Sequence, residues 1–323
     1  MIKRLLALAL FTFAAAPAAA KDLVLQQPID CELGQDCYIQ QYVDHDKGSG
    51  ARDYRCQPLS YDQHKGTDFA LHNTEQVLRG VNVIASAPGT VRNVRDGMAD
   101  RLFSDANAEN VSGRECGNGV VISHGDGWET QYCHLKKGSI TVKTGQSVGT
   151  KTILGQVGLS GRTQFPHVHL SVRKDGKVVD PFDPNGSITC GQPDQNTLWQ
   201  TPLAYQAGAV LQAGFHDSVP KFSDVKNGRA AKNSLPANAP AIVIYGYAFG
   251  TQKGDTMHLT LTGPDGVMVD QKVTIDKQQA QMFRAAGKRL KASSWSTGTY
   301  SGSAALLRDG RIISVERASI QVQ

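Results

Sequence analysis

Short segments rich in Val, Ile and Thr, bounded by Gly, Pro or Asp, recur along most of the chain. Such segments predict β-strands, and no window in the first half shows a convincing helical period. We therefore expect an all-β protein, in which an antiparallel β-rich domain precedes an immunoglobulin-like β-sandwich. The expected strands are 69–71, 81–85, 89–94, 119–123, 129–135, 138–142, 153–157 and 167–173, then 241–249, 258–262, 267–275, 300–308 and 311–322, with 277–291 favoured as strand because Gly287 would interrupt a helix.

Composition divides the 323 residues into five stretches. The first has a basic start, an apolar middle and an Ala-rich end, which predicts a cleaved secretory signal peptide. All six cysteines lie before residue 191, and the stretch after them is rich in Gln, Asn, Pro, Ala and Gly. The expected divisions are 1–20 signal peptide, 21–59 cysteine-containing N-terminal segment, 60–190 main β domain, 191–239 connector and 240–323 β-sandwich accessory domain.

An even number of cysteines in an exported chain predicts disulfides, although six cysteines allow fifteen connectivities. Cys31 and Cys37 flank a short loop, and Cys116 and Cys133 flank an expected hairpin, so these two pairs are favoured. The remaining two cysteines, Cys56 and Cys190, have no spacing that supports their pairing beyond elimination.

The charge balance is mildly basic. The formal net charge is +5, and removal of Lys3 and Arg4 with the signal peptide leaves 5 − 2 = +3. This value weakly favours an anionic partner, and ordinary surface charge explains it at least as well. The basic residues are scattered with no interleaved aromatic residues, so no nucleic-acid surface is expected. No later stretch is apolar enough to predict a membrane span.

A histidine pair lies on one expected strand, in the sequence His167-Val168-His169. Side chains two residues apart on a strand point to the same face, so both imidazoles face one space. Alone, such a pair is more often two exposed strand histidines than a metal site.

A second cluster, His64-Lys65-Gly66-Thr67-Asp68, lies about a hundred residues earlier. Gly66 and Thr67 argue against a helix here, so the segment is expected to be a turn that enters a strand. Asp68 precedes an apolar run, and a carboxylate at the edge of a core needs a partner. A third marker, Tyr132-Cys133-His134-Leu135, ends another expected strand, with Tyr132 and His134 expected on the same face.

The three motifs, H-x-x-x-D, then Y-x-H-L, then H-x-H, occur in the order typical of the lysostaphin-type zinc metallopeptidases, a family of bacterial cell-wall endopeptidases that this chain resembles. The resemblance covers roughly residues 60–185. It includes neither the N-terminal cysteine-containing segment nor the C-terminal domain. The cysteine framework and a polar insertion at 95–116 depart from the family pattern.

The resemblance implies one Zn²⁺ per chain, with His64, Asp68 and His169 as ligands and with His134 and His167 as the catalytic pair. It implies a hydrolase that cleaves peptide cross-links of peptidoglycan in the periplasm or outside the cell. No H-E-x-x-H glutamate is present, so imidazole is expected to serve as the base. Which of the two histidines does so stays open.

Two other hypotheses remain. A non-catalytic relative could activate another cell-wall hydrolase, although such relatives usually lack some ligands and none is missing here. Sugar-phosphotransfer carrier domains share a related barrel and pair two histidines for phosphate relay, but that relay is cytoplasmic and the expected signal peptide disfavours it.

Overall fold

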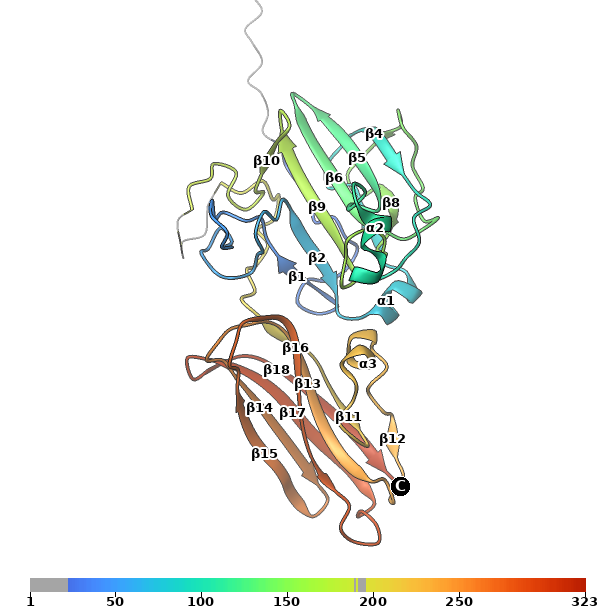
Figure 1. Ribbon diagram of the computed structural model, residues 1–323, viewed down its shortest axis with the longest axis vertical. Helices are drawn as coiled ribbons and strands as arrows, with labels where there is room; N and C mark the ends of the chain where they lie inside the picture. Colours follow the sequence, from blue (N-terminus) through green and yellow to red (C-terminus); the bar gives the residue numbers. More distant parts are fainter. Residues whose placement is uncertain (1–22, 189, 191–195) are drawn as a thin grey trace, which may run out of the picture.

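The computed structural model describes residues 23–188, 190 and 196–323, and most of its regular structure is β-sheet (Figure 1). The expected signal peptide at 1–20 lies outside the described residues. Two β domains follow one another along the chain, the first drawn from blue to yellow-green and the second from yellow to red. The expectation of an all-β, largely antiparallel protein is confirmed.

The first domain is organised on one eight-stranded sheet in which every pairing is antiparallel. Its order is β1-β2-β9-β6-β5-β4-β7, and the short β10 pairs with β9. The strands are β1 (Cys37–Gln41), β2 (Thr67–Leu71), β4 (Gly89–Arg95), β5 (Asn118–Gly125), β6 (Trp128–Leu135), β7 (Ser147–Val148), β9 (His167–Lys174) and β10 (Lys177–Val179).

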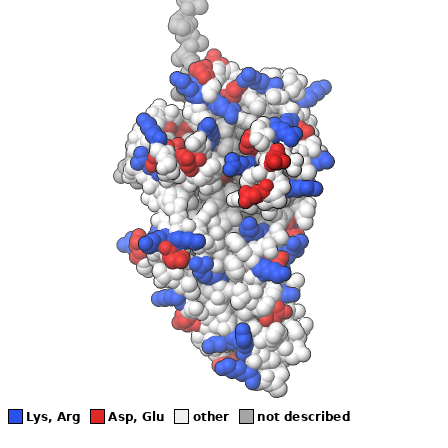
Figure 2. Space-filling view, viewed as in Figure 1, with Lys and Arg blue, Asp and Glu red and all other residues white. Residues whose placement is uncertain are grey.

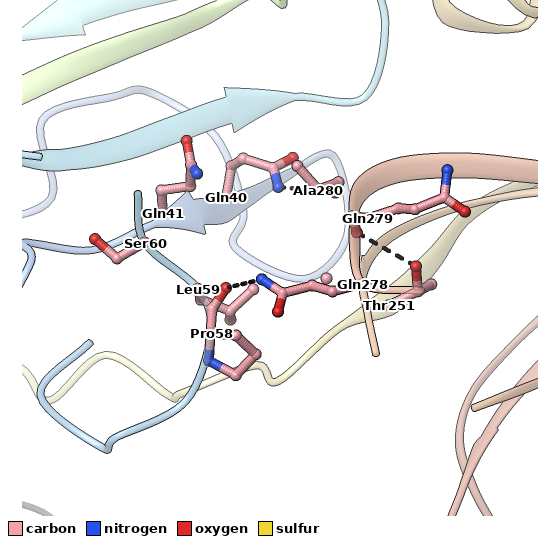
Figure 3. Close-up of a pocket in the computed structure, with 10 residues that line it drawn as sticks. Gln40, Gln41, Pro58, Leu59, Ser60, Thr251, Gln278, Gln279 and Ala280 are labelled. Atoms are coloured by element: carbon pink, nitrogen blue, oxygen red, sulfur yellow. Dashed lines mark hydrogen bonds between the residues drawn. The ribbon is translucent and has the colours of Figure 1, made fainter. Parts of the chain in front are cut away.

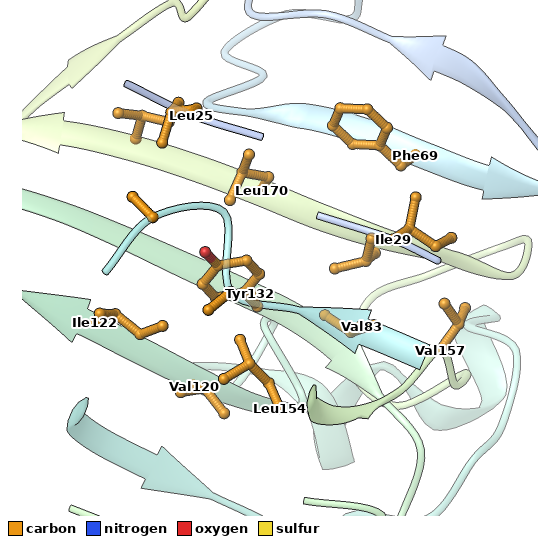
Figure 4. Packing of buried hydrophobic residues seen from close by; sticks show 14 of the residues in the cluster. Leu25, Ile29, Phe69, Val83, Val120, Ile122, Tyr132, Leu154, Val157 and Leu170 are labelled. Atoms are coloured by element: carbon orange, nitrogen blue, oxygen red, sulfur yellow. The ribbon is translucent and has the colours of Figure 1, made fainter. Parts of the chain in front are cut away.

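One face of this sheet is apolar and covered by a two-stranded sheet, β3 (Asn82–Ile84) with β8 (Ile153–Gln156). Figure 4 shows Val83 and Leu154 of the small sheet directed toward Tyr132 and Ile122 of the large one. These side chains are at most 1% exposed, which makes this layer the core of the domain. The opposite face of the large sheet is left for polar side chains.

Several segments of the first domain differ from the sequence expectations, among them the strands β1, β7 and β10, which were not expected. Residues 138–142 form no strand, because Gly138 has a φ of 72° and a lone backbone bond, Thr141 N to Leu154 O, joins the segment to β8. A short helix, α1 (Thr74–Arg79), was not expected; the capping box between Asn73 and Gln76 starts it. The insertion 95–116 contains η1 (Asp105–Asn107) and α2 (Ala108–Val111).

Three disulfides join all six cysteines, and they are the three pairs considered from the sequence. They are Cys31–Cys37, Cys56–Cys190 and Cys116–Cys133. The second closes a long loop and ties the segment before β2 to the chain after β10. The third joins the insertion to β6.

The second domain consists of two sheets that share one core, formed by the buried side chains of both. One sheet has the order β11-β13-β16 and the other β12-β18-β17-β14-β15, in which only the β12–β18 pairing is parallel. The elements are β11 (Ala209–His216), α3 (Phe222–Asn227), β12 (Ser234–Leu235), β13 (Ala241–Thr251), β14 (Thr256–Gly263), β15 (Gly266–Thr274), β16 (Gln279–Arg289), β17 (Gly298–Arg308) and β18 (Arg311–Val322).

The segment 191–239, expected as a connector, contributes to both domains where it is described. Leu198 and Trp199 are buried in the core of the first domain, and β11 pairs along most of its length with β13. The strand β11 was not expected, because the segment around it is rich in Gln, Asn and Ala and because small residues of β11 face a packed surface.

The two domains are joined by an apolar contact. Every residue of β13 is buried, because its second face packs away from the sandwich core. On that face the Phe249 ring lies 4.3 Å from the ring of Tyr38 in β1. Polar contacts surround this patch, including Gln281 Nε2 to Tyr38 Oη at 3.0 Å. A hollow of about 40 Å³ lies at the same boundary, and Figure 3 shows Gln40 on one side of it and Gln279 on the other.

The surface carries both signs of charge. Figure 2 shows Lys and Arg interspersed with Asp and Glu over both domains on the face drawn. Among the described helices, none has the length and apolar character needed to cross a membrane.

Candidate metal centre

Two paired strands and the turn before them bring His64, Asp68 and His169 together. Asp68 of β2 lies directly opposite His169 of β9 in the antiparallel register, so both side chains leave the same face of the sheet. His169 Nδ1 lies 2.8 Å from Asp68 Oδ1, and His64 Nε2 lies 3.2 Å from each of these two atoms. Three potential ligand atoms therefore surround one point.

A glycine allows the turn to approach β9 this closely. A Cβ atom at Gly66 would lie 2.6 Å from His169 Nε2 and 2.6 Å from the Leu170 carbonyl oxygen. Any side chain at this position would push the turn, and His64 with it, away from the strand. The glycine is thus required for the convergence.

The outer nitrogens of both imidazoles are occupied by fixed partners. His64 Nδ1 donates to the Tyr42 carbonyl oxygen at 2.7 Å. The Ser171 hydroxyl donates to the Lys65 carbonyl oxygen at 2.8 Å, so its oxygen accepts from His169 Nε2 at 3.0 Å. These bonds assign the proton of each neutral ring to the nitrogen that faces away from the centre. The facing nitrogens then carry lone pairs.

With both rings neutral and in this tautomer, the centre presents three acceptor atoms to one point, an arrangement that favours a cation. Asp68 is 2% exposed. Burial raises the pKa of its carboxyl, but the charges of His64 and His167 and the contact with His169 outweigh this and hold the pKa well below its ordinary value. Burial lowers the pKa of His64, and the Asp68 carboxylate raises it above its ordinary value. Two imidazoles and a carboxylate are a donor set that suits zinc.

His134 reaches the centre through an unusual backbone conformation. Its φ is 65°, and its backbone N–H donates to the Cys116 carbonyl oxygen at 2.8 Å. The expectation that Tyr132 and His134 share a face is wrong. Tyr132 is buried in the core, where its hydroxyl accepts from Ser86 N at 2.8 Å, whereas the left-handed turn directs His134 to the polar face.

His167 lies beside His134, with the two ring centroids 4.6 Å apart. His167 Nδ1 donates to the Phe165 carbonyl oxygen at 3.0 Å, and His134 Nδ1 donates to the Ser160 carbonyl oxygen at 2.8 Å. The Nε2 atom of each neutral ring is therefore the free acceptor, and that of His167 lies 3.5 Å from Asp68 Oδ1. The structure thus brings all five residues from the sequence motifs into one cluster.

Burial controls the protonation of this second pair. His134 is 7% exposed and His167 is 4% exposed. Burial, followed by the neighbouring His167 and His169, lowers the pKa of His134 well below its ordinary value. Burial also lowers the pKa of His167, partly opposed by Asp68. Both rings are accordingly neutral near pH 7 and able to accept a proton at Nε2.

Several neighbours were not assigned to the site from the sequence. The Phe165 ring stacks on His167 at 4.3 Å, and the Tyr61 ring lies 4.4 Å from that of His64. The carbonyl oxygens of Tyr42 and Ser160 orient two of the rings. No side-chain pattern predicts a backbone carbonyl partner, whereas Ser171 could have been found by its strand alternation with His169.

The region that contains this cluster is similar to known proteins. Residues 62–181 match Peptidase family M23. A segment of 122 residues is 33% identical to peptidoglycan DD-endopeptidase ShyA of Vibrio cholerae, covering 38% of this chain and 23% of that protein. A segment of 132 residues is 30% identical to DD-carboxypeptidase/endopeptidase Mpg of Neisseria meningitidis, covering 40% of this chain and 24% of that protein.

Among solved structures, the catalytic domain of the prophage-encoded M23 protein EnpA from Enterococcus faecalis matches with a TM-score of 0.32 and 24% identity. That match covers 46% of this chain and 92% of the other. The similarity to the two curated relatives spans less than a quarter of either, so it concerns this one domain.

Proposed function

Because residues 62–181 match Peptidase family M23, we propose that the chain is an exported zinc metalloendopeptidase that hydrolyses peptide cross-links of peptidoglycan. The substrate proposal draws on the two relatives named as peptidoglycan endopeptidases. The three disulfides support export, since such bonds persist in oxidising compartments.

The observation that carries this proposal is the convergence of three potential ligand atoms within 3.2 Å of one another. In the proposal His64, Asp68 and His169 hold one zinc ion. A bound zinc ion supplies Lewis-acid polarisation of a carbonyl group and an activated water. The two histidine rings are held by the Tyr42 carbonyl oxygen and the Ser171 hydroxyl, so little reorganisation of them is needed for metal binding.

His134 and His167 are proposed as the catalytic pair. Each has Nδ1 tied to a backbone carbonyl and Nε2 free, so each can accept a proton from water and return it to the leaving amine. In its protonated form, the same Nε2–H can donate to the oxyanion that forms at the scissile carbonyl. Because both rings have Nδ1 bonded to a carbonyl oxygen and Nε2 free, either histidine can be the base.

We also propose a peptidase domain at 60–190, to whose sheet β1 of the N-terminal segment is added, and an accessory sandwich at 240–323, to which β11 and β12 are added. The extent of the M23 match supports the first boundary. The pairing of β11 with β13 places part of the intervening stretch with the sandwich, so 191–239 joins both domains rather than separating them.

The test uses the full mature chain and purified sacculi. Wild-type protein is expected to bind one zinc and release soluble cross-link fragments, and His169→Ala is expected to lose both. His258→Ala serves as the control, because His258 belongs to β14 of the second domain and pairs with Asp270. Full hydrolysis by His169→Ala would refute the assignment. Stimulation of a separate wall amidase by the metal-free protein would favour the activator hypothesis instead.

A further inference from the structure

A hollow of about 160 Å³ lies on the same sheet face as the metal centre. The pairing register of the strands shows that the hollow and the candidate metal centre lie on the same face. His169 of β9 lies opposite Cys133 of β6, and Gln131 of β6 lies opposite Val121 of β5. Residues that face each other in adjacent strands share a face, so the polar face continues from β9 across β6 and β5 to Arg95 on β4.

The floor of the hollow is formed by a glycine and a disulfide. A Cβ atom at Gly119 would lie 2.5 Å from the Tyr132 carbonyl oxygen and 3.0 Å from Cys116 Sγ. The absence of a side chain there leaves the space open. The Cys116–Cys133 disulfide closes the end nearest the metal centre, since Cys133 is paired with His169.

The polar groups around the hollow present donors rather than acceptors. Asn93 Oδ1 accepts from Val94 N at 2.9 Å, and Gln131 Oε1 accepts from Arg173 Nη2. Both amide oxygens are therefore occupied within the protein. Arg95 uses only Nε internally, in a bond of 2.6 Å to the Gly117 carbonyl oxygen. Its two terminal nitrogens and the Asn93 amide N–H groups remain as donors at the rim.

The nearby charges favour an anion. Among the described residues, neither Arg95 nor Arg173 forms an ion pair, whereas Glu129 is paired with Arg92. The carboxyl of Glu115 is exposed, and its pKa is lowered by backbone N–H groups first and by the positive charges of Arg162 and Arg95 next.

We propose that this hollow is a subsite for a carboxylate of the peptide substrate, held by the Arg95 guanidinium with help from Asn93. The proposal rests on the proposed peptidase function and specifies which substrates it prefers. A guanidinium matches a carboxylate by two parallel hydrogen bonds, which gives direction as well as charge.

Strand geometry sets the position of this carboxylate along the substrate. From β9 to β4 there are three strand spacings, or about 14 Å. An extended peptide advances about 3.4 Å per residue, so the carboxylate belongs about four residues from the scissile bond. A chain-terminal carboxylate and a side-chain carboxylate both satisfy this requirement.

The test compares four forms of one fluorescently labelled, cross-linked peptide dimer. All carboxylates are free in the first, only the terminal ones are amidated in the second, only the side-chain ones in the third, and all in the fourth. Hydrolysis by zinc-loaded protein gives kcat and KM, and fluorescence anisotropy in the presence of chelator gives binding without turnover. The variants are Arg95→Gln and the control Arg311→Gln, which removes an exposed positive charge in the second domain.

We expect wild-type protein to bind the free form about tenfold more tightly than the fully amidated form, with the difference in KM rather than kcat. Arg95→Gln should reduce this preference to about twofold or less. Arg311→Gln should keep it. The second and third dimers identify which carboxylate is recognised.

Equal binding of all four forms by wild-type protein would overturn the subsite, as would an equal loss on free and amidated forms in Arg95→Gln. Carboxylate-dependent binding that requires Arg95, without any hydrolysis by zinc-loaded protein, would support the subsite and refute the proposed peptidase activity. The two conclusions can thus fail separately.

Discussion

Removal of the Cys116–Cys133 disulfide should impair catalysis by more than its effect on stability explains. His134 has a left-handed φ of 65°, and its N–H is bound to the carbonyl oxygen of Cys116, a member of this disulfide. A non-glycine residue in this region is held there by its surroundings. The double substitution Cys116→Ser with Cys133→Ser releases the segment that holds it.

The expected loss of stability follows from the closed loop. The sequence separation of 17 residues gives about 3 kcal/mol in the chain-entropy treatment of disulfides. The Cys31–Cys37 pair, with a separation of 6, gives about 2 kcal/mol by the same relation. That disulfide lies at the far end of β1 and contacts none of the five clustered residues, so the matching double-serine variant is the control.

Urea unfolding measures the stability of both variants, and sacculus hydrolysis measures kcat at a temperature where both are fully folded. The Cys116/Cys133 variant should lose about 10- to 100-fold in kcat, because small misplacement of a catalytic group has effects of this size. The Cys31/Cys37 variant should keep wild-type kcat. Equal kcat values in the two variants would show that the disulfide does not position His134.

Three further predictions concern the same cluster. His167→Gln should retain one zinc per chain and lose about 10²- to 10⁴-fold in kcat, as metal analysis beside a hydrolysis assay would show; loss of the metal would make His167 a ligand instead. Since burial lowers the pKa of His134 and His167, their protonated forms are disfavoured in the folded protein, so kcat should persist as pH falls through about 6.5 and decline only below it. A pH profile that declines above this value with zinc still bound would contradict that reasoning. Phe165→Ala should lower kcat more than it changes KM, because the ring stacked on His167 is lost while the metal ligands remain; an effect on KM alone would place Phe165 in substrate binding.

The candidate metal centre was largely predictable because two of its three potential ligands lie on regular strands. Alternation alone places His167 and His169 on one face, and the register that joins β2 to β9 adds Asp68. His64 depends on a turn, yet Gly66 lies within the motif and signals a close backbone approach. Local sequence and pairing geometry therefore point to the same three residues.

The position of His134 was not predictable in this way. Strict alternation places it with Tyr132 in the core, and only the backbone turn after Cys133 reverses it. That turn depends on a hydrogen bond to Cys116 and on the disulfide, which are contacts made by the insertion. At His134, non-local contacts therefore overrode the strand alternation.

The apolar contact between the domains argues against a freely tethered C-terminal domain. A tethered binding module would present a polar surface to the peptidase, but Tyr245, Tyr247 and Phe249 of β13 are buried on the face that meets Tyr38. Phe165 packs against this same patch and stacks on His167. Exposure of this aromatic face to water would be strongly unfavourable, so the sandwich stays packed against the first domain. It thereby supports Phe165, whose ring stacks on His167. The contacts that maintain the site therefore extend beyond residues 62–181.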